Sequence, residues 1–498
     1  MTWSKGHVRR FLPLAAAGLA SLPCAARAQE VLIEADSSQR EPEFRGRKVH
    51  GDIRFGAGFG FVAEDPIFQA EPSIGLDFRD LAPVQLRLGA PVRLRIYDRD
   101  PEQGPVVRNT EWDEVGDYLA ILQRLQYSGD YVFGREGRVL VDLRVGDLQR
   151  VQVGHGSLVR GYANSLDLDR RRTGIDLSSR VEGLLLGNPA GAELAFVVGD
   201  LSGQQIFGTR LGADWAGAGI GFSVFGDPFA ARALVPWAAN PAALAVDAQN
   251  RLVPAGSRGA TALGIDLSYR WTDHWRFLVM PYLDLNLMPG VGKGLHLGLD
   301  TEFILGRRRR ARLGAVVEMT AGDKHYDPTY FDVFYTMQRM QAQFVAYPGD
   351  LPADFAAGAL PKYGFVLQND LSGVGAYGGI RFAHDDGAFV ETGYRYRPGP
   401  LGHTWETRLG VDLEVVQLSM LHAHRGALGF DVIDPAGTLA RLDLNVPVLR
   451  WLDVFANAGY QYQVKRAPGE SAAARQPSGG FVGGGGLVMI GAAGRFGW

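Results

Sequence analysis

Three features of the sequence predict an all-β fold, a transmembrane antiparallel β-barrel of about 18–20 strands with short periplasmic turns and long extracellular loops. First, apolar and polar residues alternate along nearly the whole chain, as in strands that have two unlike faces. Second, the connections between the alternating segments are short and long in turn, which is typical of bacterial barrels. Third, no stretch beyond residue 28 is apolar for long enough to span a membrane as a helix.

The N-terminus has the pattern of a secretory signal peptide. Lys5, Arg9 and Arg10 form a basic start, residues 11–22 are an apolar core, and residues 26–28 form a small-x-small cleavage signal. We therefore expect residues 1–28 to be removed during export.

The only cysteine, Cys24, lies inside this predicted signal peptide. Its alternative role is the acylated residue of a lipoprotein, but Ser21 and Pro23 fit a lipobox poorly. Cleavage leaves the mature protein without disulfides, thiol catalysis or cysteine metal sites. Residues 29–50 then form a short periplasmic segment, which is too short to fold as a plug.

The mature chain is mildly acidic and rich in arginine. Removal of residues 1–28 takes away four basic residues and no acid, so the formal net charge changes from −3 to −7. This balance predicts no binding of nucleic acid, which needs a basic face. Arginine outnumbers lysine by 45 to 6, and guanidinium groups suit partly desolvated pairs with carboxylates or phosphates. We therefore expect many arginines to face a lumen or lipid headgroups.

The strands are predicted from runs in which apolar residues share one parity. No linker or shift in composition divides them, so residues 51–498 are predicted to form a single barrel. The clearest segments in chain order are 53–61, 86–96, 139–145, 263–271, 275–285, 295–303, 390–396, 409–415, 442–446, 454–462 and 488–498.

The last of these segments ends on an aromatic residue, Trp498. It resembles the closing strand of Gram-negative outer-membrane β-barrels, in which such a residue lies at the membrane interface. The resemblance covers the mature chain as a pattern and points to no narrower family. It implies contact with outer-membrane lipids and lipopolysaccharide, and assembly by the barrel-assembly machinery through the C-terminal strand ending at Trp498.

The connections separate a barrel from other all-β folds. Short links follow even-numbered strands, at 82–83, 272–274, 306–310, 385–387 and 450–451. Long links follow odd-numbered strands, at 98–113, 150–172, 226–259, 321–369 and 466–477. A β-sandwich array predicts similar loop lengths at both ends, and a β-helix predicts a fixed repeat. The alternation therefore favours a barrel whose long loops face outward. The arginine run at 307–312 is then either a solvated turn or an anchor to lipid headgroups.

A barrel of this width needs loops to narrow its lumen. The large loop 321–369 is the candidate constriction, because its aromatic and methionine side chains would not stay solvated. We expect it either to fold into the lumen as an eyelet or to cap the barrel with its own small core, with a short helix around 330–340. Its candidate residues are Tyr330, Phe331, Phe334, Tyr335, Met337, Arg339 and Met340. The large loop 226–259 is weakly polar and is expected to pack against the rim or the lumen wall.

Charged residues of the polar parity are candidates to line the pore. They are Arg87, Arg93, Arg95, Asp142, Arg144, Asp266, Asp284, Asp412 and Glu414. Pairs of opposite charge across strands would form a structural network, whereas a separation of charge across the lumen would orient polar solutes.

The sequence predicts a protein that is not an enzyme and that carries no metal and no cofactor. The nearest enzyme pattern is His155 with Ser157, which resembles the pair in outer-membrane phospholipase A, with Asn164 as the nearest asparagine. The likeness covers two residues only. The histidines lack the spacing of metal ligands.

The predicted function is passive or facilitated diffusion of small solutes through an outer-membrane channel. One alternative is FadL-like transport of hydrophobic compounds, although that family carries a longer N-terminal hatch than residues 29–50 allow. Another is a barrel anchor that presents surface loops for adhesion or partner binding.

Overall fold

The fold was obtained as a computed structural model. It describes residues 49–62, 65–78, 81–96, 112, 114–134, 136–168, 171–203, 205–238, 240–245, 252–272, 276–306, 311–340, 360–385, 387–399, 402–413, 415–427, 437–464, 474–475 and 481–497. The predicted signal peptide, Glu414 and Trp498 lie outside the described residues, as does the segment 29–50 except for its last two residues.

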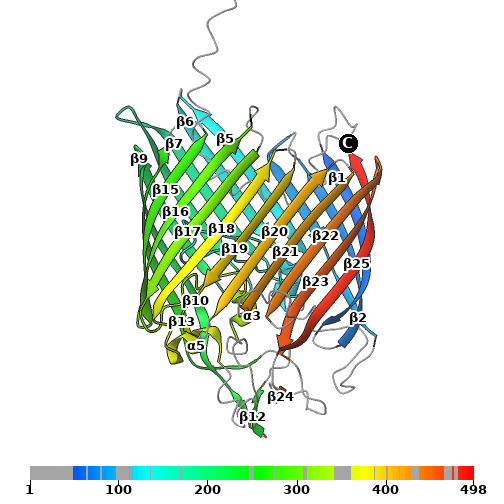
Figure 1. Ribbon diagram of the computed structural model, residues 1–498. Helices are drawn as coiled ribbons and strands as arrows, with labels where there is room; N and C mark the ends of the chain where they lie inside the picture. The colour runs from blue at the N-terminus through cyan, green and yellow to red at the C-terminus, as the bar shows by residue number, and fades with distance from the viewer. Residues whose placement is uncertain are drawn as a thin grey trace, which may run out of the picture.

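The described strands form one closed antiparallel barrel (Figure 1). Its 22 hydrogen-bonded segments make 20 wall strands, because β3 and β4 both pair with β2, and β13 and β14 both pair with β15. The wall closes where the first strand pairs with the last, from His50 opposite Gly497 to Phe61 opposite Gly486. The prediction of an antiparallel barrel of about 18–20 strands is confirmed.

The wall consists of β1 (His50–Val62), β2 (Asp65–Asp77), β3 (Val84–Gly89), β4 (Val92–Arg95), β5 (Leu122–Phe133), β6 (Gly137–Gly146), β7 (Gly174–Leu185), β8 (Asn188–Val198), β9 (Phe207–Trp215), β10 (Ala218–Leu234), β13 (Pro254–Tyr269), β14 (Trp271–Thr272), β15 (Phe277–Met288), β16 (Gly292–Leu305), β17 (Ala311–Gly322), β18 (Gly373–His384), β19 (Ala388–Tyr396), β20 (His403–Leu413), β21 (Val416–Ala427), β22 (Thr438–Leu449), β23 (Leu452–Val464) and β25 (Phe481–Gly497). The helices are short: α2 (Val115–Leu119), α3 (Tyr335–Gln338) and α5 (Lys362–Gln368). Among the described residues, no helix is long and apolar enough to cross a membrane.

The two faces of each wall strand differ as the alternation predicts. In β1, Phe55 and Phe59 are exposed on the outside at 56% and 65%, whereas the intervening Gly56 and Gly58 are buried. In β25, Val488 is exposed and Met489 is buried. A strand of period two therefore presents one apolar face to lipid and the other to the interior.

The barrel has one end with short turns and one with long connections. In Figure 1 the short turns, such as residues 186–187 and 216–217, lie at the upper end and the long connections at the lower end. The strands extend further into the predicted loops than the sequence suggested. The region 226–259 narrows to a connection at 235–253, because β10 and β13 continue to pair across two register shifts. The region 321–369 becomes a connection at 323–372.

A second, small sheet projects beyond the lower end of the barrel. It is formed by β11 (Pro236–Trp237), β12 (Asn240–Ala245) and β24 (Ala474–Arg475), with Leu244 paired to Arg475. This sheet joins two long connections outside the wall.

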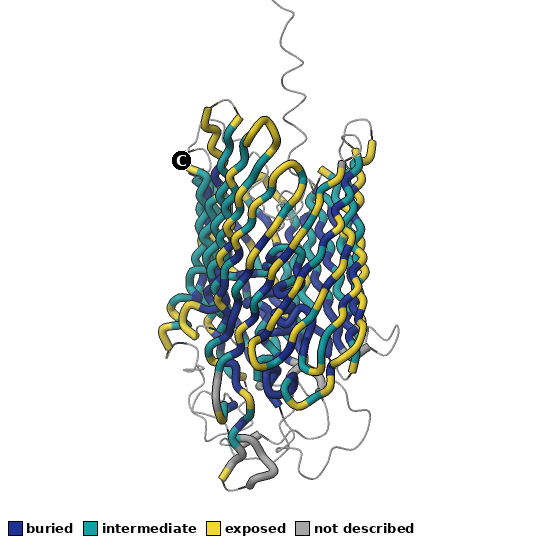
Figure 2. Tube along the Cα trace, turned by 90° about the vertical axis from the view of Figure 1, so that its left-hand side faces the viewer, coloured by how far each residue is buried: buried dark blue, intermediate teal, exposed yellow. Residues whose placement is uncertain are grey.

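Two other long connections turn inward. Figure 2 shows buried segments inside the lower part of the barrel, where residues 147–173 and 323–372 contribute to a hydrophobic cluster with the inner faces of the wall strands. The apolar core of this molecule therefore lies in the lumen, and it is made largely of loops. We call the described residues 147–168 and 171–173 the first inward loop, and the described residues 323–340 and 360–372 the second inward loop.

Candidate functional site

The first inward loop is folded back on itself. The backbone N–H of Val151 donates to the carbonyl of Tyr162 at 2.8 Å, and the N–H of Tyr162 donates to the carbonyl of Val151 at 3.1 Å. Gly156 and Gly161 lie between them with φ of +85° and +69°, backbone conformations that residues other than glycine rarely adopt. The glycine-rich sequence thus permits a tight loop that fits inside the barrel.

The second inward loop adds to the first through backbone hydrogen bonds. Val159 and Phe331 form a parallel bridge, in which the N–H of Phe331 donates to the Leu158 carbonyl at 3.1 Å. The N–H of Arg160 donates to the Phe331 carbonyl at 3.2 Å, and the N–H of Thr329 donates to the Ser157 carbonyl at 2.9 Å. The two inward loops are therefore one structural unit.

Aromatic side chains hold this unit in the lumen. The ring of Phe331 lies 4.9 Å from the rings of both Tyr330 and Tyr335, and all three are buried. They pack with Tyr162 of the first inward loop and with Phe225 of β10. Burying rings of this size stabilises the docked loops, since replacing a buried Phe by Ala typically costs about 3–5 kcal/mol.

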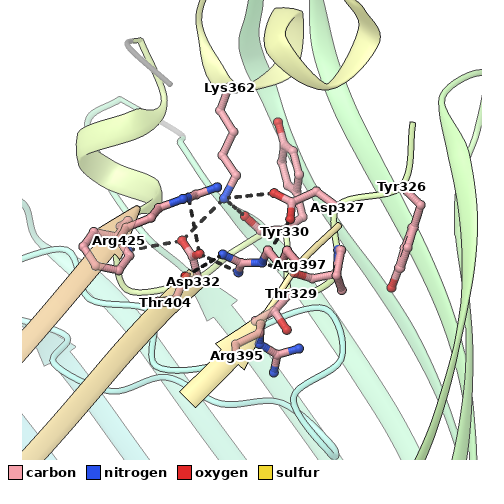
Figure 3. A network of polar contacts seen from close by, with 12 residues as sticks. Tyr326, Asp327, Thr329, Tyr330, Asp332, Lys362, Arg395, Arg397, Thr404 and Arg425 are labelled. Carbon is pink, nitrogen blue, oxygen red and sulfur yellow. Dashed lines mark hydrogen bonds and ion pairs between the residues drawn. The ribbon is translucent and has the colours of Figure 1, made fainter. Parts of the chain in front are cut away.

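A buried ionic cluster fixes the second inward loop to the wall (Figure 3). Lys362 of α5 donates through Nζ to the Tyr330 carbonyl at 2.6 Å and lies 3.4 Å from Asp332 and 3.5 Å from Asp327. Arg397, which follows β19, pairs with Asp332 at 2.9 Å, and Arg425 of β21 lies 3.7 Å from it. The five charged residues, which we call the ionic latch, are Asp327, Asp332, Lys362, Arg397 and Arg425.

Burial and charge act in opposite directions on the latch. Burial by itself raises the pKa of Asp332, but Lys362, Arg397 and Arg425 outweigh it and hold the pKa below the ordinary value of 3.8. Burial lowers the pKa of Lys362, and Asp332 and Asp327 oppose that change. The carboxylate of Asp332 is therefore the ionised centre of the latch at neutral pH.

A second attachment lies on β10. The hydroxyl of Tyr335 donates to Asp227 at 2.7 Å, and the guanidinium of Arg339 pairs with the same carboxylate at 2.5 Å. The side chain of Asp227 is fully buried, so these contacts supply the partners that a buried charge requires.

A third polar network surrounds Glu318 on β17, whose side chain is fully buried. Arg160 and Arg395 each lie 3.1 Å from its carboxylate, as does His296. Tyr282 donates its hydroxyl to the same carboxylate at 2.7 Å. Both guanidinium groups also lie against the ring of Tyr377 on β18, at 4.2 Å for Arg160 and 4.6 Å for Arg395. This network connects the first inward loop to five neighbouring strands of the wall, β15 to β19.

A cavity lies where both inward loops face strands β18–β20. It has a volume of about 570 Å³, including the solvent-filled space at its opening. The loops contribute Arg150, Gln152, Arg160, Gly161, Thr329, Asp332 and Val333, and the wall and the turn after β19 contribute Tyr377, Glu391, Gly393, Arg395, Arg397, Thr404, Glu406 and Arg408.

The predicted pore-lining residues divide into two groups. Arg93, Asp266 and Asp284 are buried beneath or beside the first inward loop: Arg93 donates to the Leu168 carbonyl at 2.6 Å, Asp266 pairs with Arg210 at 2.8 Å, and Asp284 lies 2.8 Å from His155. The others described are partly buried on the inner wall: Arg87, Arg95, Asp142, Arg144 and Asp412. Several have opposite charges close by, as in the pair of Arg87 with Asp52 at 3.1 Å.

The predicted constriction residues all lie in the second inward loop. The structure buries Tyr330, Phe331, Phe334 and Tyr335 and leaves Met337, Arg339 and Met340 half-buried. Phe334 belongs to a separate apolar cluster with Leu421 and Leu439 on the wall. The described part of the loop lies within the barrel and contains the short helix α3.

The structure does not assemble the phospholipase-like set of His155, Ser157 and Asn164. His155 lies 2.8 Å from Asp284 and stacks on Tyr282 at 4.2 Å. The side chain of Asn164 instead bonds to backbone groups, accepting from the N–H of Leu148 at 2.6 Å and donating to carbonyls of residues 146, 172 and 199. Among the described residues, no hydrogen bond joins His155 to Ser157 or Asn164, and no cluster of His, Asp or Glu has the arrangement of a metal site.

The residues that line the cavity, above all Arg160, Tyr377 and Arg395, are not predicted from the sequence. The length of segment 150–172 predicts an external loop, but its apolar residues indicate a buried segment: Val151, Val153, Leu158, Val159 and Tyr162. No sequence pattern marks the wall residues Tyr377 and Arg395 as cavity residues, because their role depends on which loop lies opposite them.

Comparison with known proteins identifies no family for this chain. No family model matches it, and no curated protein matches it. Among solved structures it is similar to a mutant ferric enterobactin receptor from Pseudomonas aeruginosa in complex with enterobactin, with 11% identity, 91% of this chain and 82% of that chain covered, and a TM-score of 0.35. It is also similar to a mutant Rh. blastica porin, with 9% identity, 90% and 99% covered, and a TM-score of 0.26. These scores carry no argument about function.

Proposed function

We propose that this closed β-barrel is a Gram-negative outer-membrane channel for small solutes, with its aperture set by the two inward loops. The observation that carries the proposal is the parallel bridge between Val159 and Phe331, which joins the loops inside the lumen beside a cavity of about 570 Å³. A loop unit that is fixed to the wall narrows a wide barrel without filling it with a separate domain.

The polarity of the cavity supports a preference for polar solutes. Charged residues form most of its lining, whereas the aromatic rings of Tyr330, Phe331 and Tyr335 are buried against one another. The FadL-like alternative drew its motivation from these aromatic residues, and their burial gives it no support.

A second candidate function is the presentation of a binding surface. The small sheet of β11, β12 and β24 projects beyond the lower end of the barrel, where it would meet an external partner. This arrangement favours adhesion or partner binding as an additional role of the long connections.

We also propose where the protein is located and how it is assembled. The chain is exported, its apolar outer face contacts outer-membrane lipids and lipopolysaccharide, and the barrel-assembly machinery recognises its C-terminal strand. The exposed apolar residues of β1 and β25 support the contact with lipid.

The test is single-channel conductance of the refolded protein in planar bilayers. The wild-type protein should give stable steps, and a variant in which a short Gly-Ser linker replaces residues 323–372 should give larger ones. A matched variant with residues 235–253 shortened should keep the wild-type conductance, because β12 of that connection lies beyond the lower end of the wall. Equal conductance of the wild-type and 323–372 variants would show that the loop sets no aperture, and silence from verified folded barrels would overturn the channel function.

A further inference from the structure

The charges around Glu318 do not balance. Arg160 and Arg395 both pair with this single carboxylate, at 3.1 Å each. Two guanidinium groups and one carboxylate leave one positive charge uncompensated within the triad, since guanidinium stays protonated in proteins. His296 and Tyr282 also bond to Glu318, and neither brings a further negative charge.

Hydrogen bonding at these two arginines is also incomplete. Nη1 of Arg160 and Nη2 of Arg395 are buried and have no hydrogen-bond partner among the described residues. Arg395 is only 4% exposed. Buried donors without partners are costly, and a native structure that keeps them needs a reason. The Tyr377 ring lies against both groups and accounts for part of their environment, but it supplies no formal negative charge.

The rest of the cavity does not neutralise this excess. Its lining holds five arginines and three carboxylates. Arg150 pairs with Glu391, and Arg408 pairs with Glu406 at 2.7 Å, so these charges cancel locally. Asp332 is shared by the cations of the ionic latch. The wall that faces the cavity therefore carries net positive charge.

We infer that this cavity is a selective binding site for oxyanions, and that solutes carrying a carboxylate or a phosphate are the ones the channel passes. The inference deepens the proposed channel function and rests on it. Arginine matches the paired oxygens of carboxylate and phosphate, and hydrogen bonds to an ionised group are stronger than neutral ones. Arg160 comes from the first inward loop and Arg395 from the wall, and both line the cavity. An oxyanion bound in the cavity therefore contacts donors from the loop and from the wall.

The test measures ion preference and block in planar bilayers. Reversal potentials under a KCl gradient should show that the wild-type channel prefers chloride to potassium. Succinate and inorganic phosphate, added separately, should reduce the chloride current in a saturable way, and comparing them distinguishes a carboxylate site from a phosphate site. Arg160→Gln and Arg395→Gln should each weaken block by the preferred anion roughly 10-fold or more.

Arg381→Gln is the matched control. Arg381 also lies on the wall, in β18, and pairs with Asp300 at 2.7 Å, but it does not line the cavity. Its loss removes the same charge and should leave block by succinate or phosphate within about twofold. An equal loss of block in this control would overturn the inference in favour of diffuse lumen charge.

A conservative variant covers the risk that glutamine disturbs the fold. Arg395→Lys keeps the charge next to Glu318 but removes the planar fork, so chloride preference should remain while block weakens. Unchanged block in this variant would contradict an oxyanion site built on the guanidinium groups.

Failure of the inference differs from failure of the channel function. A wild-type channel that conducts but shows no saturable block by either anion refutes the oxyanion site and leaves the channel intact. If folded wild-type protein gives no current, calorimetric titration with succinate and phosphate tests the oxyanion site by itself. Binding heat that the wild-type protein shows and Arg395→Gln lacks supports the site in a protein that is not an open channel. Absence of binding heat in the wild-type protein refutes the site.

Discussion

Arg160 and Arg395 bind the two oxygens of one carboxylate. Nη2 of Arg160 lies 3.1 Å from Oε2 of Glu318, and Nη1 of Arg395 lies 3.1 Å from Oε1. Because Arg160 belongs to the first inward loop while Glu318 and Arg395 stand on β17 and β19, this shared carboxylate joins the loop to the wall.

Replacing Glu318 by Gln should release the first inward loop. The change leaves two buried guanidinium groups without their counter-charge, and breaking a buried pair in this way typically costs about 3–5 kcal/mol. The free energy of unfolding in detergent and the rate of proteolysis within 147–173 measure the effect. Asp130→Asn is the control, because Asp130 and its partner Arg138 form a more exposed pair, for which roughly 0–1 kcal/mol is expected. A loss of stability no larger than that of the control would contradict the role of Glu318.

Replacing Lys362 by Met should loosen the second inward loop. Lys362 is buried and contacts the Tyr330 carbonyl at 2.6 Å, so its loss leaves that carbonyl and two aspartates with fewer partners. Since Arg397 still pairs with Asp332, we expect a moderate cost of about 1–3 kcal/mol. Faster cleavage within 323–372 by added protease is the readout. Lys324→Met, an exposed lysine of the same loop, should leave the cleavage rate unchanged, and equal rates in the two variants would rule out a latch.

Replacing Gly294 by Ala should displace Tyr326. A Cβ at Gly294 would lie 2.0 Å from the Tyr326 ring, which is held by hydrogen bonds of 2.8 Å from Asn286 and 2.6 Å with His296. Overpacking of this kind costs about 1–3 kcal/mol, and the loop that carries Tyr326 should shift. Single-channel recordings should then show larger or noisier steps.

Gly378→Ala provides the comparison for that experiment. Gly378 also lies on a wall strand, and nothing lies within 4 Å of a Cβ added there. Its recordings should match those of the wild-type protein. Wild-type behaviour of the Gly294 variant would show that Tyr326 does not hold the loop.

Mild acid should not open the ionic latch. Three cations outweigh burial and depress the pKa of Asp332 below 3.8 in the folded protein. A group whose folded pKa is depressed stabilises the fold above its unfolded pKa and loses that contribution as the pH falls through the folded value. The latch contribution should therefore be constant between pH 7 and about pH 5 and decline only below about pH 4. Proteolysis of residues 323–372 with an acid-active protease measures this, and Asp332→Asn should abolish the acid-dependent part. A transition near pH 6 that Asp332→Asn removes would be inconsistent with a depressed pKa.

The wall was predictable from the sequence because its physics is local. Each strand has one face toward lipid, so apolar residues such as Phe55 and Phe59 reveal their direction by parity alone. Counting the alternating segments gave the number of strands, and the alternation of short and long links supported that number and distinguished the two ends of the barrel.

The site was only partly predictable because it depends on contacts between distant segments. Aromatic content identified the second inward loop, and Tyr330, Phe331 and Tyr335 are indeed buried. The partners of Arg160 and Arg395 depend on which loop turns inward and on where that loop meets the wall. The parity of apolar residues and the spacing of the links predict neither of these two features. The same holds for Asn164, whose side chain supports backbone groups.

Because the apolar cluster lies in the lumen, the wall and the lumen contents of this protein are stabilised in two different ways. The outer face of the wall is stable because lipid surrounds it, whereas the rings packed around Phe331 are stable because water is excluded from them, as in the core of a small globular protein. Urea weakens the second kind of stabilisation directly. The lumen contents should therefore melt like a soluble miniprotein while the wall around them keeps its strands, so that near-ultraviolet circular dichroism changes at a lower urea concentration than the β-sheet signal.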